Sequence, residues 1–384
     1  MAETNYGGVA TPRIWIDYIQ YAKAIGMVGD FLTGNGLSGS TVDPSLAWDF
    51  NPTRMTSYEI TNSSKVAAFR VNMNYRGTKE QYQFRRLLST ANYGMILGLD
   101  GSGVTKSDDT YSRFEVKGDV TGNGQDDHNS GVEGLDTIVG VGALNGTDWI
   151  NTAGYSIQTF DGFYSDDDYN FDRIVHVLYN KGNDDTDGLS LGDVIKIGTF
   201  SFGKYFDLPH SANLSIKQTI AYDGVKTKRT IGGADLTQVN YTRPKWGDLA
   251  SWTSVNRSDY VDSDQGVLNA DYSNAGFQGR RSWDLAFSYI SKEDMFPRTF
   301  HNNSAGYYDL SDTQEFDSNA DLHNDNVVGN WINLTLSGQI PFVFQPDKTK
   351  NSDFAIVRID KPSLSIEQVA YQVYDFSVRL IEVF

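Results

Sequence analysis

One stretch decides the fold of the C-terminal half of this chain: Trp283-Asp284-Leu285-Ala286-Phe287-Ser288-Tyr289. Its large apolar side chains recur at every second position, which predicts a strand with Trp283, Leu285, Phe287 and Tyr289 on one face. Such alternation is typical of a sheet that packs one face on a core and leaves the other in water. We therefore expect a β-rich unit to be built around this strand.

A helix and three further strands are expected after it. The helix is predicted over residues 325–337, where Asn324 or Asp325 can act as the N-cap and Gly338 lies beyond the end. The apolar positions of this helix are Val327, Trp331 and Leu334. The strands are predicted at residues 340–345, 353–359 and 371–383. We interpret the whole as a closed or nearly closed β-barrel with one packed helix.

The composition favours a mostly β protein with two domains. Aromatic residues make up 13% of the 384 residues, and the 37 glycines suit many turns between short strands. In the N-terminal half, strands are predicted at residues 13–21, 65–75, 95–99, 154–160, 173–179 and 193–202. Their spacing is typical of a jelly-roll-like β-sandwich. We place the sandwich at residues 1–208 and the barrel domain at residues 209–384.

One helix is predicted in the N-terminal half, between the second and third strands. Thr78 and Gln81 have the spacing of a capping box at its start. Its apolar stripe is formed by Phe84, Leu87, Leu88 and Ala91. The resulting strand–helix–strand order resembles that of the C-terminal unit, which leaves an old duplication open.

The charge and the missing cysteines exclude several classes of partner. A formal net charge of −17 disfavours binding to nucleic acid and to anionic membranes, although a ring could still present acidic residues to a lumen through which DNA slides. Without cysteine, neither a disulfide nor a thiolate metal site can form. The start of the chain lacks the basic and apolar regions of a signal peptide, so we expect synthesis in a cytoplasm.

Three segments of the chain resemble virion structural proteins of tailed bacteriophages. They are YFDLPHS at 205–211 with a hairpin around YDGVK at 222–226, RSWDLAFSY at 281–289, and GQIPFVFQPD at 338–347 with the terminal strand. The order of elements over about the last 180 residues is similar to the tail-tube-like domain of distal tail proteins. The resemblance implies a ring of identical copies, a hexamer or, if the duplication is real, a trimer. It also implies other tail or baseplate proteins as partners and a location in the virion tail.

A possible calcium loop lies at Asp119-Val120-Thr121-Gly122-Asn123-Gly124-Gln125-Asp126-Asp127. It resembles an EF-hand or dockerin loop, with Asp119, Asn123 and Asp127 as candidate metal ligands. Thr121 and Ser130 replace the acids expected at the third and twelfth positions. An ordinary surface loop is therefore the favoured interpretation, and no other cofactor is expected.

Four basic residues mark a candidate partner-binding surface on the hairpin predicted around Asp223-Gly224: Lys217, Lys226, Lys228 and Arg229. In so acidic a chain, a basic ribbon is either a solvated outer face or a docking surface for an acidic neighbour. Tyr307 and Tyr308 lie in a polar segment where no core is predicted. They either contact a partner or pack beneath their own loop.

No catalytic motif is found in the sequence. The five histidines have no metal-binding spacing, and the acids Asp166, Asp167 and Asp168 are more typical of a solvated loop than of a glycosidase pair. We therefore expect a non-enzymatic component of a phage tail end or baseplate, whose ring joins the tail tube to peripheral proteins or fibres. A receptor- or carbohydrate-binding virion module is the alternative, and a polysaccharide-degrading enzyme comes last.

Overall fold

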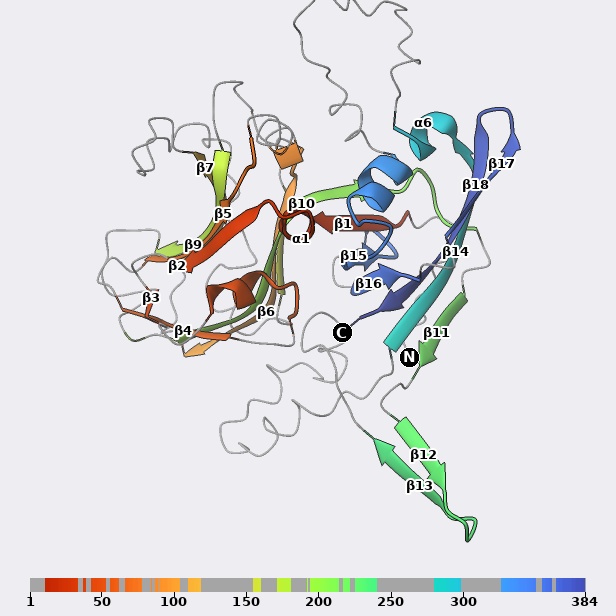
Figure 1. Ribbon diagram of the computed structural model, residues 1–384, viewed down its shortest axis with the longest axis horizontal. Helices are drawn as coiled ribbons and strands as arrows, with labels where there is room; N and C mark the ends of the chain where they lie inside the picture. The colour runs from red at the N-terminus through yellow and green to blue at the C-terminus, as the bar shows by residue number, and fades with distance from the viewer. Residues whose placement is uncertain are drawn as a thin grey trace, which may run out of the picture. The chain divides into compact units, whose positions relative to one another are not determined.

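The structure is a computed structural model (Figure 1) of the 384-residue chain. It describes residues 11–33, 37–38, 43–52, 56–61, 66–77, 84, 87–88, 90–103, 110–118, 155–159, 171–180, 192, 194–213, 217–221, 225–239, 280–297, 326–349, 354–360 and 364–383. The described part is mostly antiparallel β-structure with a few short helices. This confirms the fold class expected from the sequence, a mostly β protein.

Contacts divide the chain into two compact units. Unit 1 comprises residues 1–14, 207–292 and 337–384, and unit 2 comprises residues 15–206 and 293–336. Strands β1 (Arg13–Asp17) and β10 (Val194–Asp207) therefore have residues in both units. The predicted domains 1–208 and 209–384 differ from these units mainly in segments 1–14 and 293–336, and that division stays a prediction.

Unit 1 is built on an antiparallel sheet in the order β11-β14-β18-β16-β15, with β17 paired to β18. The bounds of these strands are β11 Lys217–Ala221, β14 Arg280–Ser291, β15 Phe342–Gln345, β16 Ala355–Ile359, β17 Ser365–Ala370 and β18 Val373–Glu382. A separate two-stranded sheet consists of β12 (Val225–Arg229) and β13 (Asp235–Val239). The strand predicted around Trp283 is thus the second strand of the main sheet.

The alternation that predicted β14 is confirmed for three of its four apolar residues. Trp283, Leu285 and Phe287 are buried, and the Trp283 ring lies 5.5 Å from that of Phe344. Tyr289 was wrongly placed on the same face. The pairing of β14 with β18 shifts register after Phe287, and Tyr289 adopts a φ of +66° and is 80% exposed. A β-bulge inserts an extra residue, which reverses the alternation beyond it.

The predicted C-terminal helix is present as a π-helix, η5 (Val327–Asn333). Its N-cap is Asn326, whose side chain accepts a hydrogen bond from Gly329 N–H, so the predicted caps Asn324 and Asp325 are wrong. The apolar positions Val327, Trp331 and Leu334 are all buried as predicted. The contact-based division places this helix in unit 2.

Unit 2 contains two antiparallel sheets, ordered β3-β4-β10-β6-β8 and β2-β5-β9-β7. The bounds of its remaining strands are β2 Val28–Thr33, β3 Leu37–Ser38, β4 Thr56–Ile60, β5 Val66–Met73, β6 Tyr93–Gly103, β7 Thr110–Gly118, β8 Tyr155–Thr159 and β9 Phe171–Asn180. Aromatic side chains from the two sheets meet. Phe69 on β5 and His176 on β9 both contact Phe200 on β10, at ring-centroid distances of 5.0 and 4.2 Å. Such contact between the inner faces of two sheets is the packing of a β-sandwich.

The strand predicted at residues 13–21 was too long. β1 ends at Asp17, and the helix α1 (Tyr18–Ala24) begins there because the Asp17 side chain accepts a hydrogen bond from Gln20 N–H at 2.8 Å. Two other helices have all their residues described: the 3₁₀ helix η1 (Pro44–Trp48) and the one-turn α6 (Lys292–Met295).

The helix predicted to follow Thr78 is described only in part. Phe84, Leu87 and Leu88 are helical, and these three residues and Ala91 are buried, as predicted for the apolar stripe. Its predicted capping box lies outside the described residues. Among the helices that are described, none is both long and apolar enough to span a membrane.

Candidate assembly surface

Two groups of predicted site residues lie outside the described part of the chain: the candidate calcium ligands Asp119, Asn123 and Asp127, and the tyrosines Tyr307 and Tyr308. Their proposed roles stay predictions. Elsewhere, no three His, Asp or Glu side chains in the described ranges are grouped closely enough to hold a metal ion.

The hairpin predicted around Asp223-Gly224 is contradicted by the strand pairing. β11 pairs with β14, and β12 pairs with β13, so β11 and β12 are not hairpin partners. Lys217 lies opposite Asp284, and Asp284 in turn lies opposite Arg379, with which it forms an ion pair of 3.6 Å. Opposite charges on adjacent strands stabilise a sheet. Lys217 therefore lies in a cross-strand row of alternating charge, apart from the other three basic residues.

Residues 225–239, here called the basic arm, form the actual hairpin (Figure 1). Its strands are joined by a turn in which Gly233 has a φ of +84° and Thr230 N–H donates to Ala234 O at 2.8 Å. This turn is what fixes β12 and β13 in register. The sequence-based hairpin was placed at Asp223-Gly224 instead, although the Gly232-Gly233 pair is also a hairpin signal.

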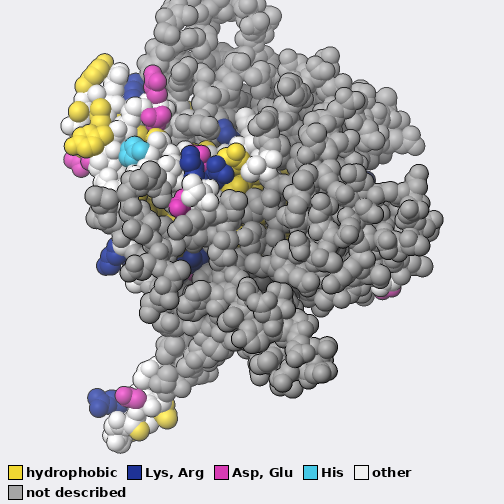
Figure 2. Space-filling view, turned by 180° about the vertical axis from the view of Figure 1, so that it is seen from behind, with side chains coloured by type: hydrophobic (Ala, Val, Ile, Leu, Met, Phe, Trp, Pro, Cys, Tyr) yellow, Lys and Arg dark blue, Asp and Glu magenta, His cyan; other side chains and the backbone are white. Residues whose placement is uncertain are grey.

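The basic arm exposes both charged and apolar side chains. Lys228 and Arg229 are exposed, and Arg229 lies 3.8 Å from the exposed Asp235. Ile231 and Leu236 are also exposed, and Figure 2 shows apolar and basic side chains together at the end of this arm. A two-stranded hairpin is marginally stable on its own in water. We therefore expect the basic arm to become more stable when another protein surface covers its exposed apolar side chains.

The second exposed element is the β17–β18 tip, residues 365–375. All six residues of β17 are exposed. The large apolar side chains exposed on the tip are Ile366 and Val369 of β17 and Tyr371 of the following turn. Apolar side chains gather at this tip in Figure 2. In the described part of the chain β18 is the only strand paired with β17. The outer edge of β17 is therefore a row of backbone groups available to another strand.

Two carboxylates face each other on this tip. Glu367 on β17 and Asp375 on β18 are directly opposite in the register. Like charges in opposite positions destabilise a strand pair, so this pair favours a cation beside it. Asp375 Oδ1 also accepts a hydrogen bond from Tyr289 N–H at 2.9 Å, which ties the β14 bulge to the tip.

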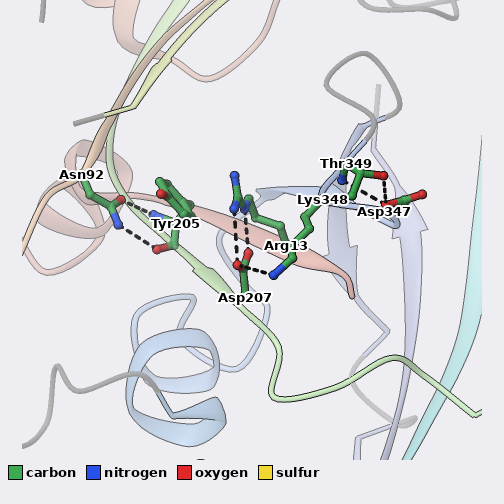
Figure 3. A network of polar contacts seen from close by, with 7 residues as sticks. All are labelled: Arg13, Asn92, Tyr205, Asp207, Asp347, Lys348 and Thr349. Carbon is green, nitrogen blue, oxygen red and sulfur yellow. Dashed lines mark hydrogen bonds and ion pairs between the residues drawn. The ribbon is translucent and has the colours of Figure 1, made fainter. Parts of the chain in front are cut away.

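An ion-pair network holds the three segments of unit 1 together (Figure 3). Asp207 accepts from Arg13 Nε at 2.7 Å and from Lys348 Nζ at 3.1 Å. Backbone bonds run alongside, from Leu208 N–H to Pro12 O and from Lys348 N–H to Thr11 O, both at 3.0 Å. Burial alone would raise the pKa of Asp207, but the hydrogen bonds from Arg13 and Lys348 outweigh it, and the pKa lies below its ordinary value.

The buried polar groups of unit 2 belong to its interior. Tyr93 Oη and Ser201 Oγ are 2.8 Å apart and buried, and Asn92 exchanges two hydrogen bonds with the backbone of Tyr205 (Figure 3). Asp17 is also buried, and burial raises its pKa to about 6. These groups position β1, β6 and β10.

No protein-family model matches the chain, and no curated protein matches it either. Among solved structures, the chain is similar to a carbohydrate-binding module, CBM32-1 from a family 31 glycoside hydrolase of Clostridium perfringens. The match has 14% sequence identity and a TM-score of 0.25, and it covers 46% of this chain and 96% of that one. A TM-score this low establishes no common fold, so we infer neither fold nor ligand from it. The described structure defines a mostly β protein with exposed side chains on two strand pairs, β12–β13 and β17–β18.

Proposed function

We propose that the chain is a non-enzymatic structural component of a phage tail end or baseplate, forming a ring that joins the tail tube to peripheral proteins or fibres. The observation that carries the proposal is β17, an edge strand whose six residues are all exposed. Proteins that act alone usually cover or charge such edges, because an open edge pairs with other chains. The resemblance of three segments to phage tail proteins supplies the particle in which this pairing takes place.

The two predicted domains have separate roles in this proposal. Residues 209–384 form the tail-tube-like module, and residues 1–208 form a jelly-roll-like sandwich that projects outward and binds neighbouring tail or baseplate proteins. Within the described part of unit 1, β11 has only β14 as a sheet partner. We propose that neighbouring copies pair along the open edges of β11 and β17 and so complete the predicted barrel, because strand addition satisfies open backbone groups.

Mass measurement of the full-length protein tests the proposal. Size-exclusion chromatography with light scattering, followed by native mass spectrometry, is expected to show a hexamer, or a trimer if the chain carries an internal duplication. Electron micrographs of the same sample should show rings. A strict monomer at high concentration, together with its absence from purified virions, would contradict the proposal.

The same preparation distinguishes the proposed structural function from the carbohydrate-binding alternative. A receptor-binding module is expected to retain glycans on an array whether or not it forms rings. Rings without glycan binding support the structural function, and glycan binding by a strict monomer supports the alternative.

A further inference from the structure

We propose that the basic arm of one copy docks on the β17–β18 tip of the next copy, so that β12 extends the sheet at β17 and Lys228 lies beside the Glu367–Asp375 pair. This inference rests on the proposed ring and names the surfaces that would form its contacts. It commits to a second copy of this chain as the partner of the tip.

Charge complementarity is the first argument. The tip places two carboxylates opposite each other, and the basic arm carries the exposed cations Lys228 and Arg229. A lysine beside the two carboxylates removes the repulsion between them, because an opposite charge lies close to both. In a chain of net charge −17, two copies repel each other unless oppositely charged patches meet. The arm and the tip are such patches, and one chain supplies both.

Backbone and apolar groups give the second argument. In the described part of the chain, β12 pairs only with β13 and β17 pairs only with β18, so each strand has an edge open to the other. Around these edges lie the exposed apolar side chains Ile231 and Leu236 on the arm, and Ile366, Val369 and Tyr371 on the tip. Main-chain pairing supplies affinity in strand addition, and side chains on alternate positions supply specificity.

The proposed contact is compatible with a ring. The arm and the tip are different surfaces of the same chain, so the proposed contact can repeat head-to-tail from one copy to the next. A head-to-tail contact closes into a ring when its rotation divides a full turn, and otherwise makes an open filament.

Charge reversal in the full-length chain tests the docking. Lys228→Glu or Glu367→Lys alone is expected to weaken self-association by about fivefold or more, because each places like charges in contact. The double variant is expected to restore association to within about threefold of the original protein. Arg358→Glu on β16 and Glu59→Lys on β4 make the same charge changes at exposed strand positions that belong to neither the arm nor the tip, and they serve as matched controls. Circular dichroism melting checks that each variant is folded.

A cross-link provides a second measurement that does not depend on weakened association. The chain has no cysteine, so Lys228→Cys and Glu367→Cys introduce single thiols. Mixing the two proteins under mild oxidation is expected to give a disulfide-linked dimer, whereas Lys228→Cys mixed with Glu59→Cys should give none. Disulfide formation requires the two Cα atoms to come within about 7 Å of each other.

The outcomes separate the docking from the ring itself. Rings that persist in both single reversal variants and give no cross-link would overturn the docking and leave the proposed function standing. An original protein that stays monomeric at all concentrations would overturn both. Rescue in the double variant together with the cross-link would support both.

Discussion

Arg281 and Glu382 form an ion pair in the interior of unit 1, with 3.3 Å between Arg281 Nη2 and Glu382 Oε1. Their side chains are only 8% and 3% exposed. The guanidinium also donates to Phe354 O at 3.0 Å and lies 5.0 Å from the centre of the Trp283 ring. Arg281 N–H donates to Glu382 Oε2 at 2.8 Å. Together these bonds fix the beginning of β14 against the end of β18.

Glu382→Ala is expected to lower the free energy of unfolding by about 3–5 kcal/mol, because it leaves a buried guanidinium without its counter-charge. Urea unfolding followed by tryptophan fluorescence measures the loss. The double variant Arg281→Met/Glu382→Leu should recover most of it, since an apolar pair of similar volume has no charge to desolvate. A loss below about 1 kcal/mol for Glu382→Ala would contradict a buried pair, because that is the range of an exposed one.

Asp17→Asn is expected to change how the stability of unit 2 depends on pH. Burial raises the pKa of Asp17 to about 6 from a model-peptide value of 3.8. A carboxyl with a raised pKa in the folded state contributes most stability below pH 3.8, and that contribution is lost as the pH rises through 6. The unfolding free energy of the variant minus that of the original protein should therefore increase by up to about 3 kcal/mol between pH 4 and pH 7. Thermal melts at half-unit pH steps measure this difference, and a flat difference curve would contradict the raised pKa.

His176→Phe is expected to have the opposite effect on the pH dependence. His176 is buried among Phe69, Phe114 and Phe200, both of its ring nitrogens lack a hydrogen-bond partner, and burial lowers its pKa from 6.5 to about 3. The folded state holds this ring neutral, so its contribution to stability is complete above pH 6.5 and is lost as the pH falls toward 3.

Replacing His176 with phenylalanine removes the loss of stability that the original protein suffers as the pH falls. The variant should gain stability relative to the original protein by up to about 1.4 kcal/mol for each pH unit below 6.5. Between about pH 4 and 6 the slopes of Asp17 and His176 oppose each other, so each substitution exposes the slope of the residue that remains. Equal pH dependence in the variant and the original protein would show that His176 is hydrated.

The sequence predicted β5, β9, β10 and β14, whereas β2, β3, β4 and β7 were not predicted. In β14 the alternation of apolar residues records burial directly. Trp283, Leu285 and Phe287 were assigned to one face and are buried there. The prediction stopped being correct at Tyr289, because a bulge depends on how β14 pairs with β18 and leaves no local pattern. At Asp17 the local pattern again failed to predict where the regular strand ends. A helix cap interrupts a run of β-forming residues, and the run alone favoured a longer strand.

The candidate surface was predicted less well than the core. Lys217 and Lys228 lie close together in the sequence, and a hairpin through Asp223-Gly224 would have placed them on one ribbon. The partner of β11 is instead β14, which is more than 50 residues further along the chain. Strand partners at such separation are set by packing of the whole sheet, which local turn signals do not record. The exposed strand β17 was missed because its isolated apolar residues lack the period of a buried face.

Tyr289→Gly is expected to stabilise the free protein and weaken its self-association. Tyr289 has a φ of +66°, a conformation that costs a residue with a side chain roughly 1–2 kcal/mol relative to its usual region and costs glycine almost nothing. The gain is reduced because glycine makes the unfolded chain more flexible, and urea unfolding should show a net gain of up to about 1 kcal/mol.

The Tyr289 side chain is 80% exposed beside the β17–β18 tip, so its ring contributes little to the fold of a single copy. Strained residues cluster at functional sites and tyrosine is enriched in interfaces, so we expect the Tyr289 side chain to contact a neighbouring copy. Light scattering should therefore show weaker rings for Tyr289→Gly than for the original protein. The matched variant Ser337→Gly, at an exposed residue outside the tip with a φ of +55°, should gain similar stability without that loss. If both variants assemble as well as the original protein does, Tyr289 has no role in the contact between copies.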